Sequence, residues 1–351
     1  MKKQRLMQFI SALAALVFCF LLIADSKGTA EAAKQSVTVC LSVIIPSLFA
    51  FMVFAQIIVK SGIADILFYP LYKISFWFKG NRREFAIFML SLIGGYPVGI
   101  KLLRDYIAYN KNYTAIAEKM LCYCYCGSPS FIIQIAGIAV FGSFKAGLLV
   151  YLSNIAACFT ACIIINLFAK RTDKVESKKA PIKLSMTDFT ESIGDSVKAL
   201  GIICGTIVAF NIFIELIRFT GINSFFEHIG AEKILAAALE ISNLTLFSGK
   251  NFGMLPVISA LTSFGGVCIL FQTAALSKGE IPLKSFILAR LPVSLLSAMF
   301  TSLLMKLFPI SLESSVNTTA VTAFSAVNPI AVICLIIMTF ILLKDNEKTK
   351  S

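Results

Sequence analysis

Long uncharged apolar stretches recur along this chain, and each is too long and too apolar to remain in water. The first, Leu6–Ala24, follows the basic segment Met1–Arg5. About 20 such residues cross the roughly 30 Å hydrocarbon core of a bilayer. The apolar part of a signal peptide runs only about 7–15 residues, so we favour a retained helix over a cleaved leader. The other stretches are Gln35–Val59, Met120–Phe144, Ala146–Ala169, Ala199–Ile214, Asn251–Ser277, Leu291–Met305 and Ser314–Leu343.

Composition supports the same conclusion. The chain has 351 residues, of which 58% are hydrophobic and 15% charged. Soluble domains are about 25% charged, so this chain has too little polar material for an aqueous surface. We therefore predict an all-α, polytopic helical membrane protein, whose main partner is the lipid bilayer. A disordered regulator, a disulfide scaffold and a conventional soluble enzyme are excluded.

The net charge of +13 follows from topology. Lys and Arg accumulate in cytoplasmic loops, so a polytopic protein becomes basic without a polyanion, and we expect no nucleic-acid partner. Lys170–Lys183 and the tail Lys344–Ser351 are basic, whereas Pro309–Ala320 has no Lys or Arg. These segments predict that both termini are cytoplasmic.

An internal repeat emerges when the two halves are aligned. Ser42–Ile63 lies over Gly201–Ile222, and Ser91–Gly95 lies over Thr262–Gly266. The charge distribution gives the two long helices opposite directions, which predicts an inverted repeat; chance agreement of Ile- and Phe-rich helices is the alternative. The predicted organisation is a first helix with connector (1–35), a first repeat (36–169), a basic cytoplasmic linker (170–196), a second repeat (197–308), and a last helix with tail (309–351).

Two apolar segments contain interruptions. Phe85–Leu103 is broken by glycines and a proline, and Ile234–Phe247 is short and contains a carboxylate. Lipid tolerates broken backbone only where protein or a water-filled cavity satisfies it, so both predict re-entrant or discontinuous helices. The start of a half-helix in such a break would suit an anionic or carbonyl group. A hairpin that only packs tightly is the alternative. The residues singled out here are Gly94, Gly95, Pro97, Gly99 and Lys101.

A second break is expected at Gly127–Ser130, where Ser128 would cap a helix that begins near Pro129. The preceding Cys122, Cys124 and Cys126 resemble a metal motif. In a helix, however, the middle thiol would face away from the other two, and the chain has a single histidine. A Cu(I) site is the remaining alternative. We expect no metal and no cofactor.

A third region is Leu239–Asn243. A carboxylate inside a membrane is costly, so Glu240 is a candidate for pairing with a cation or carrying a proton, with Asn243 beside it. A glutamate at the outer headgroups is the alternative. Gly265 and Gly266 align with the glycines of the first break but lack the following proline and lysine. Gln56 and Glu215 occupy equivalent repeat positions.

Enzyme chemistry has no support in the sequence, which contains neither HExxH nor GxSxG. We therefore expect no catalytic residues and no enzymatic activity.

The chain resembles the YlbJ-type sporulation integral membrane proteins, which belong to the wider nucleoside-recognition or Gate-domain set. The resemblance spans most of the chain after Ala30. It is carried by Glu31–Ile58, Ser91–Tyr106, Cys126–Ile133, Leu239–Asn243 and Ser263–Gln272. It implies a protein of the bacterial cytoplasmic membrane in an endospore former, with a transporter-like scaffold. The residues that match the family's motifs are Gly94, Gly95, Pro97, Gly99, Lys101, Ser128, Pro129, Glu240 and Asn243.

The leading hypothesis is a protein that binds or moves a small solute between two inverted halves. The solute would lie near the breaks at Gly94–Lys101 and Gly127–Ser130, opposite Glu240 and the pair Gly265 and Gly266. The competing hypothesis is a membrane protein that assembles the spore envelope without transport. Both leave room for a homo-oligomer or for envelope protein partners.

Overall fold

The described parts of the chain are mainly helical, as the apolar stretches predicted. The computed structural model describes residues 2–75, 78–109, 111–168, 185–247 and 251–308. Within these ranges no β-strand occurs, and six helical segments are long and apolar enough to cross a membrane. The chain is therefore an all-α polytopic membrane protein.

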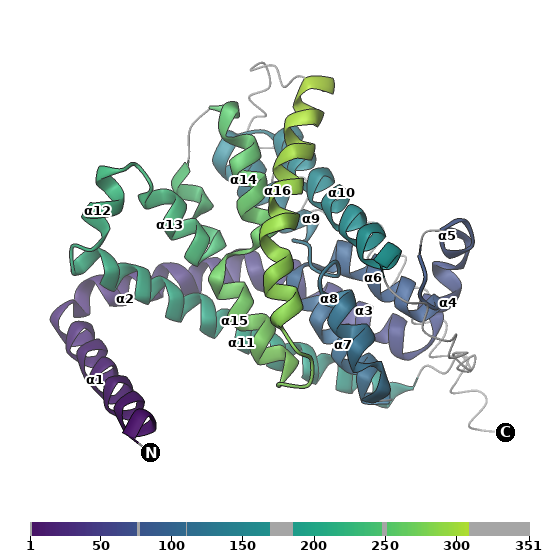
Figure 1. Ribbon diagram of the computed structural model, residues 1–351, viewed down its shortest axis with the longest axis horizontal. Coiled ribbons are helices and arrows are strands. Elements are labelled where there is room, and N and C mark those ends of the chain that lie inside the picture. Colours follow the sequence, from purple (N-terminus) through teal and green to yellow (C-terminus); the bar gives the residue numbers. More distant parts are fainter. Residues whose placement is uncertain (1, 76–77, 110, 169–184, 248–250, 309–351) are drawn as a thin grey trace.

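The first half begins with a separate helix and a long one. Helix α1 (Lys2–Ala24) projects from the body and contacts mainly α2 among the described elements (Figure 1). Helix α2 (Ser26–Val39) continues through the π-helix η1 (Cys40–Ile44) into α3 (Ile45–Lys60). Together they form one span of 35 residues. At 1.5 Å per residue this span is about 52 Å long, so it exceeds the hydrocarbon core.

A helical hairpin follows the short helices α4 (Ile63–Leu67) and α5 (Tyr69–Ile74). Its arms are α6 (Arg82–Gly94) and α7 (Tyr96–Tyr109), joined at Gly95. At the open end, Tyr106 on α7 donates to the Glu84 carboxylate on α6 at 2.7 Å. The arms therefore run antiparallel, and the predicted break of Phe85–Leu103 is confirmed as a hairpin.

The next pass is interrupted. Helix α8 (Thr114–Leu121) ends before an unwound segment, 122–128. Helix α9 (Pro129–Phe131) then leads into the π-helix η3 (Ile132–Ala139). After that, α10 (Phe144–Phe168) is an uninterrupted span. The stretch Met120–Phe144 is thus not one continuous helix.

The second half begins with α11 (Met186–Phe219), a helix of 34 residues. Its first turns include residues that the sequence placed in the linker 170–196. Three short elements follow: α12 (Asn223–His228), α13 (Glu232–Leu239) and the 3-10 helix η4 (Ile241–Phe247). After the 3-10 turn η5 (Phe252–Met254), α14 (Leu255–Phe264) and α15 (Gly266–Ser277) form one broken pass, and α16 (Lys284–Leu307) closes the described chain.

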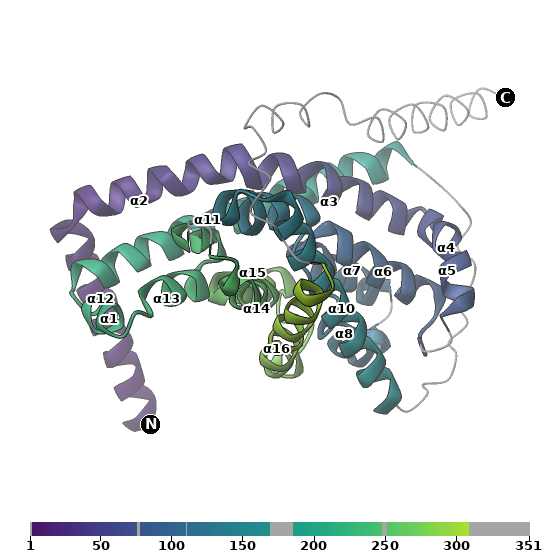
Figure 2. The same ribbon diagram turned by 90° about the horizontal axis from the view of Figure 1, so that it is seen from above.

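The two long helices pack side by side in opposite directions. Helix α11 lies against both α2 and α3 (Figure 2). Gln56, near the end of α3, donates to Ser196 near the start of α11 at 2.8 Å, and the Lys60 amine lies 3.5 Å from Glu191. Gln56 therefore lies in this contact, whereas Glu215 pairs with Arg218 at 3.7 Å.

Close helix contact requires Gly99 on α7. A β-carbon at this position would clash with the carbonyl oxygen of Cys124 in the unwound segment. The glycine thus lets the hairpin approach the backbone of the interrupted pass.

We predict that Gly99→Ala destabilises the protein by about 1–3 kcal/mol, because the backbone oxygen opposite cannot move aside easily. The matched control is Gly201→Ala, since nothing lies within 4 Å of a β-carbon added at this position on α11. Thermal unfolding in detergent measures both. Equal melting temperatures for the two variants would contradict the packing described here.

Candidate functional site

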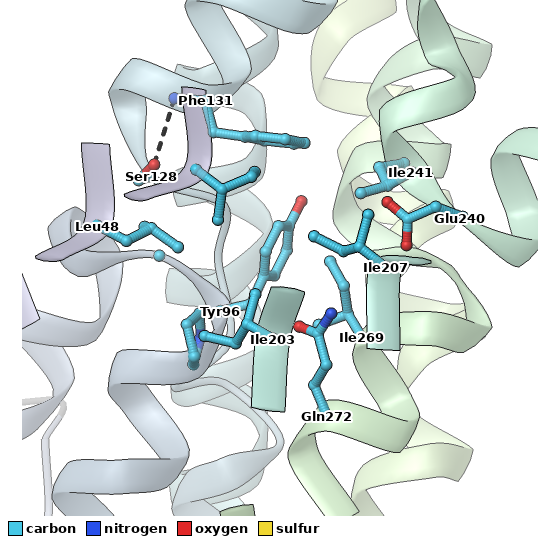
Figure 3. A pocket seen from close by; sticks show the side chains of 13 residues that line it. Leu48, Tyr96, Ser128, Phe131, Ile203, Ile207, Glu240, Ile241, Ile269 and Gln272 are labelled. Atoms are coloured by element: carbon cyan, nitrogen blue, oxygen red, sulfur yellow. Dashed lines mark hydrogen bonds between the residues drawn. The ribbon is translucent and has the colours of Figure 1, made fainter. Parts of the chain in front are cut away.

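A small cavity lies where the interruptions of the two halves meet (Figure 3). Its wall is mainly aliphatic, with a few polar groups. Ser128 and Glu240 lie on opposite sides of it, with Tyr96 between them. The lining residues are Ile44, Leu48, Gly95, Tyr96, Pro97, Ser128, Phe131, Ile203, Ile207, Glu240, Ile241, Ile269 and Gln272.

The hairpin tip forms one side of the cavity. Gly95 has φ of +92°, in the region that favours glycine, and α7 starts at the next residue. Pro97 fits the first turn of α7 because a backbone N–H there has no partner within the helix. The start of α7 therefore faces the cavity with the positive end of its helix dipole.

Ser128 stands beside the hairpin tip. Its hydroxyl oxygen accepts a hydrogen bond from the Phe131 N–H at 3.2 Å, which confirms the predicted cap of the helix that begins at Pro129. The following turns are π-helical, a distortion that is frequent at functional sites. The same hydroxyl can still donate into the cavity.

Glu240 forms the opposite side, in the turn between α13 and η4. Its side chain is 1% exposed. One carboxylate oxygen accepts from the Ser242 N–H at 3.1 Å, and Oε2 has no hydrogen-bond partner among the described residues. The Cys268 thiol lies next to the carboxyl group. A buried carboxylate oxygen without a partner favours a cation, a donor group or a proton.

Tyrosine and arginine side chains satisfy the carbonyls that the interruptions leave free. The Tyr96 hydroxyl donates to the carbonyl of Thr262, and the Tyr125 hydroxyl donates to that of Phe264 at 3.2 Å, both near the end of α14. Arg290 on α16 donates to the Cys122 carbonyl at the end of α8.

Two further carbonyls at helix ends are satisfied in the same way. Tyr151 on α10 donates to Leu92 near the end of α6 at 3.2 Å, and Arg104 on α7 donates to Leu276 near the end of α15 at 3.1 Å. Each of these donors lies on a different element from its acceptor, so the interruptions are linked into one framework.

Four of the predicted site residues line the cavity: Gly95, Pro97, Ser128 and Glu240. The others lie outside the lining. Gly94 is the last residue of α6, Gly99 contacts the unwound segment, and Pro129 begins α9. Asn243 donates to Asn211 on α11 at 2.9 Å and so joins two elements.

Gly265 and Gly266 form the break between α14 and α15, with φ of +85° and +82°. A β-carbon at 265 would clash with the Tyr125 hydroxyl. This glycine therefore leaves room for the Tyr125 side chain, which donates to the Phe264 carbonyl. The glycine pair thus shapes the framework around the cavity without lining it.

Lys101 lies away from the cavity, more than one turn along α7 from the hairpin tip. Its amine is 4.0 Å from the Asp195 carboxylate on α11. It lies in a separate, tightly packed contact with Met52, Gln56, Val98 and Leu102. Lys101 is thus on the first turns of α7, as the sequence indicated, but the helix turns its side chain toward α3 and α11, and it does not line the cavity.

Arg290 is the main residue of the site region that the sequence interpretation missed. Its side chain is 1% exposed, and the guanidinium lies over the rings of Tyr125 and Phe286, 4.5 and 4.8 Å from their centroids. A signal existed: the residue interrupts an apolar run, and an ionisable residue within a membrane segment is a functional candidate. The predicted stretch began one residue later.

Three cysteines lie in the unwound segment: Cys122, Cys124 and Cys126. The helical-spacing argument therefore does not apply to them. Across the described ranges, no three His, Cys, Asp or Glu side chains gather in a way that could hold a metal ion.

The fold and cavity define a class: polytopic membrane proteins in which interrupted helices surround a central cavity. No protein-family model matches this chain, and no solved structure matches it significantly. The chain is 24% identical to the "Sporulation integral membrane protein YlbJ" of Bacillus subtilis. The alignment covers 84% of this chain and 82% of that protein, so the similarity spans most of both chains.

We predict that Arg290→Leu loosens the unwound segment. The Cys122 carbonyl would lose its donor, at a cost of about 1–3 kcal/mol. Hydrogen exchange of the amides in 122–126 should then become faster, while Lys284→Ala, at the start of the same helix, should leave it unchanged. Unaltered exchange in a folded Arg290→Leu protein would show that the guanidinium does not hold this segment.

Proposed function

We propose that this chain moves a small solute across the bacterial cytoplasmic membrane through the central cavity, in the context of sporulation. The observation that carries the proposal is the meeting of Gly95, Ser128 and Glu240 around one cavity. Sporulation comes from the name of the Bacillus subtilis relative. Transport comes from the geometry alone.

The chemistry of the cavity supports a small solute with both polar and apolar parts. The start of α7 and the Ser128 hydroxyl offer positive potential and a donor to an acceptor group. Glu240 offers an oxygen without a partner on the other side. It would bind a donor group of the solute or carry a coupling proton or cation. The aliphatic wall would hold the apolar part.

The element order supports an inverted repeat as the scaffold for transport. Each half has a long helix, a turn that reaches the cavity, a broken pass and a continuous helix. In the first half these are α3, the α6–α7 hairpin, α8–α9 and α10; in the second they are α11, α13–η4, α14–α15 and α16. The packing of α3 against α11 in opposite directions agrees with inversion.

This order pairs Gly95 with the turn at Glu240, and the segment 122–128 with Gly265 and Gly266. This pairing differs from the sequence alignment, in which Gly94 and Gly95 correspond to Gly265 and Gly266. In this scheme each half contributes one turn and one broken pass to the cavity. We further propose that the protein is not an enzyme and that its termini are cytoplasmic.

The test uses the full chain in proteoliposomes and a small-molecule extract of sporulating cells. Mass spectrometry should detect at least one solute that accumulates in wild-type vesicles above the level of empty vesicles. Glu240→Gln keeps the size of the side chain but removes its charge, so accumulation should fall to the background level.

The matched control is Glu227→Gln, because Glu227 lies on the short helix α12 outside the cavity lining. It should accumulate the solute normally. If no solute accumulates, or if Glu240→Gln transports like the wild type, the transport proposal is wrong and the envelope-assembly hypothesis takes its place.

A further inference from the structure

A second group of polar residues lies between the cavity and the end of the molecule where α11 begins, here termed the linker end. Three helices contribute to this group. Along each of them, a residue that lines the cavity is followed by polar residues toward the linker end. The order is Leu48, Gln56 and Lys60 on α3; Pro97, Lys101 and Asp105 on α7; and Ile203, Asp195 and Glu191 on α11. We call Gln56, Lys60, Lys101, Asp105, Ser192, Asp195, Glu191 and Ser196 the polar column.

Direct links in the polar column tie α11 to the other two helices. Gln56 donates to Ser196 at 2.8 Å, and the Lys60 amine lies 3.5 Å from the Glu191 carboxylate. The Lys101 amine, with 3% of its side chain exposed, lies 4.0 Å from the Asp195 carboxylate. The Gln56 and Lys60 contacts join α3 to α11, which pack side by side, and the Lys101–Asp195 pair links α7 to α11.

The polar column is also under-satisfied. The Lys101 amine, the Gln56 amide oxygen, the Ser192 hydroxyl and one Asp105 carboxylate oxygen are buried without hydrogen-bond partners among the described residues. Apolar side chains of Met52, Val98 and Leu102 fill the space around Gln56 and Lys101. The interior of this contact is therefore packed at a cost for each unsatisfied group, while the Glu191 and Asp195 side chains at the linker end are 67% and 37% exposed.

The ion pairs favour a closed contact and the unsatisfied polar groups favour an open, hydrated one. Such a contact can act as a gate. If α3 and α7 separate from α11, the ion pairs weaken, but every unsatisfied group gains water. A purely apolar contact would gain nothing from hydration. The closed and open states can therefore be close in free energy, so that a bound solute can shift their populations.

We propose that the polar column is the gate of the cavity at the linker end, an inference that rests on the transport function proposed above. Its ion pairs keep the gate closed in this structure, and its hydrated polar groups would line the path of the solute when the gate opens.

Native cysteines allow the gate to be tested without knowledge of the solute. Cys268 is fully buried beside Glu240, and Cys162 is fully buried in α10. In inside-out membrane vesicles, a membrane-impermeant maleimide reports access to each thiol, and mass spectrometry resolves the labelled peptides. Cys268 does not line the cavity but lies beside Glu240, which does, so its labelling reports access to this region, and Cys162 reports unfolding.

We expect Asp195→Asn to increase the labelling rate of Cys268 on the order of ten-fold, within the usual range for coupled equilibria. Labelling of Cys162 should not change, and right-side-out vesicles should show no increase for either thiol. The matched control is Arg218→Ala, which removes ion pairs with Glu215 and with Glu232 on α13, near the other end of α11. It should leave the labelling of Cys268 unchanged.

If Cys162 is also labelled faster, Asp195→Asn unfolds the protein. The double variant Lys60→Ala with Glu191→Ala, at the outer end of the polar column, is then used in its place. Unchanged labelling of Cys268 in a folded variant, or an equal increase in Arg218→Ala, would overturn the gate. If Cys268 responds as expected while Glu240→Gln has no effect on solute accumulation, the gate stands and the proposed transport function fails.

Discussion

The structure depends on one constraint: backbone groups freed by an interrupted helix have no water to bind inside a membrane. Here the free carbonyls receive donors from side chains of other elements. Tyr96 and Tyr125 bond the end of α14, and Arg290 bonds the end of α8. Without such donors, the lowest free energy would belong to continuous helices, and no central cavity would form.

The cavity is a consequence of these bonds. Each one joins elements that are far apart in the chain, so the hairpin tip, the unwound segment and the broken pass are fixed relative to one another. The side chains that form these bonds cannot donate the same hydrogens to a solute. The Tyr96 hydroxyl, for example, donates to the Thr262 carbonyl. The groups left over, chiefly Ser128 and Glu240, supply the polar chemistry of the cavity.

The sequence predicted the interruptions well, because glycine and proline act locally. Gly95 permits a positive φ, and Ser128 followed by Pro129 specifies a helix start without reference to the rest of the fold. The carboxylate within the apolar segment Leu239–Asn243 likewise singled out Glu240, which lines the cavity. Partners across the fold could not be predicted in this way. The donor to Cys122 is Arg290, and only the tertiary structure brings the two together.

Lys101 illustrates the same limit. It follows the hairpin tip in the sequence, yet the helix carries it away from the cavity to Asp195.

The most direct test of the central constraint removes only the hydroxyl groups of the tyrosines that bond the end of α14. Measured in bicelles, Tyr96→Phe and Tyr125→Phe should each lower the free energy of unfolding by roughly 0.5–2 kcal/mol. Tyr69→Phe, at a residue with 39% exposure, should not change it. Equal stability of all three variants would contradict the claim that side-chain donors hold the interrupted helices in place.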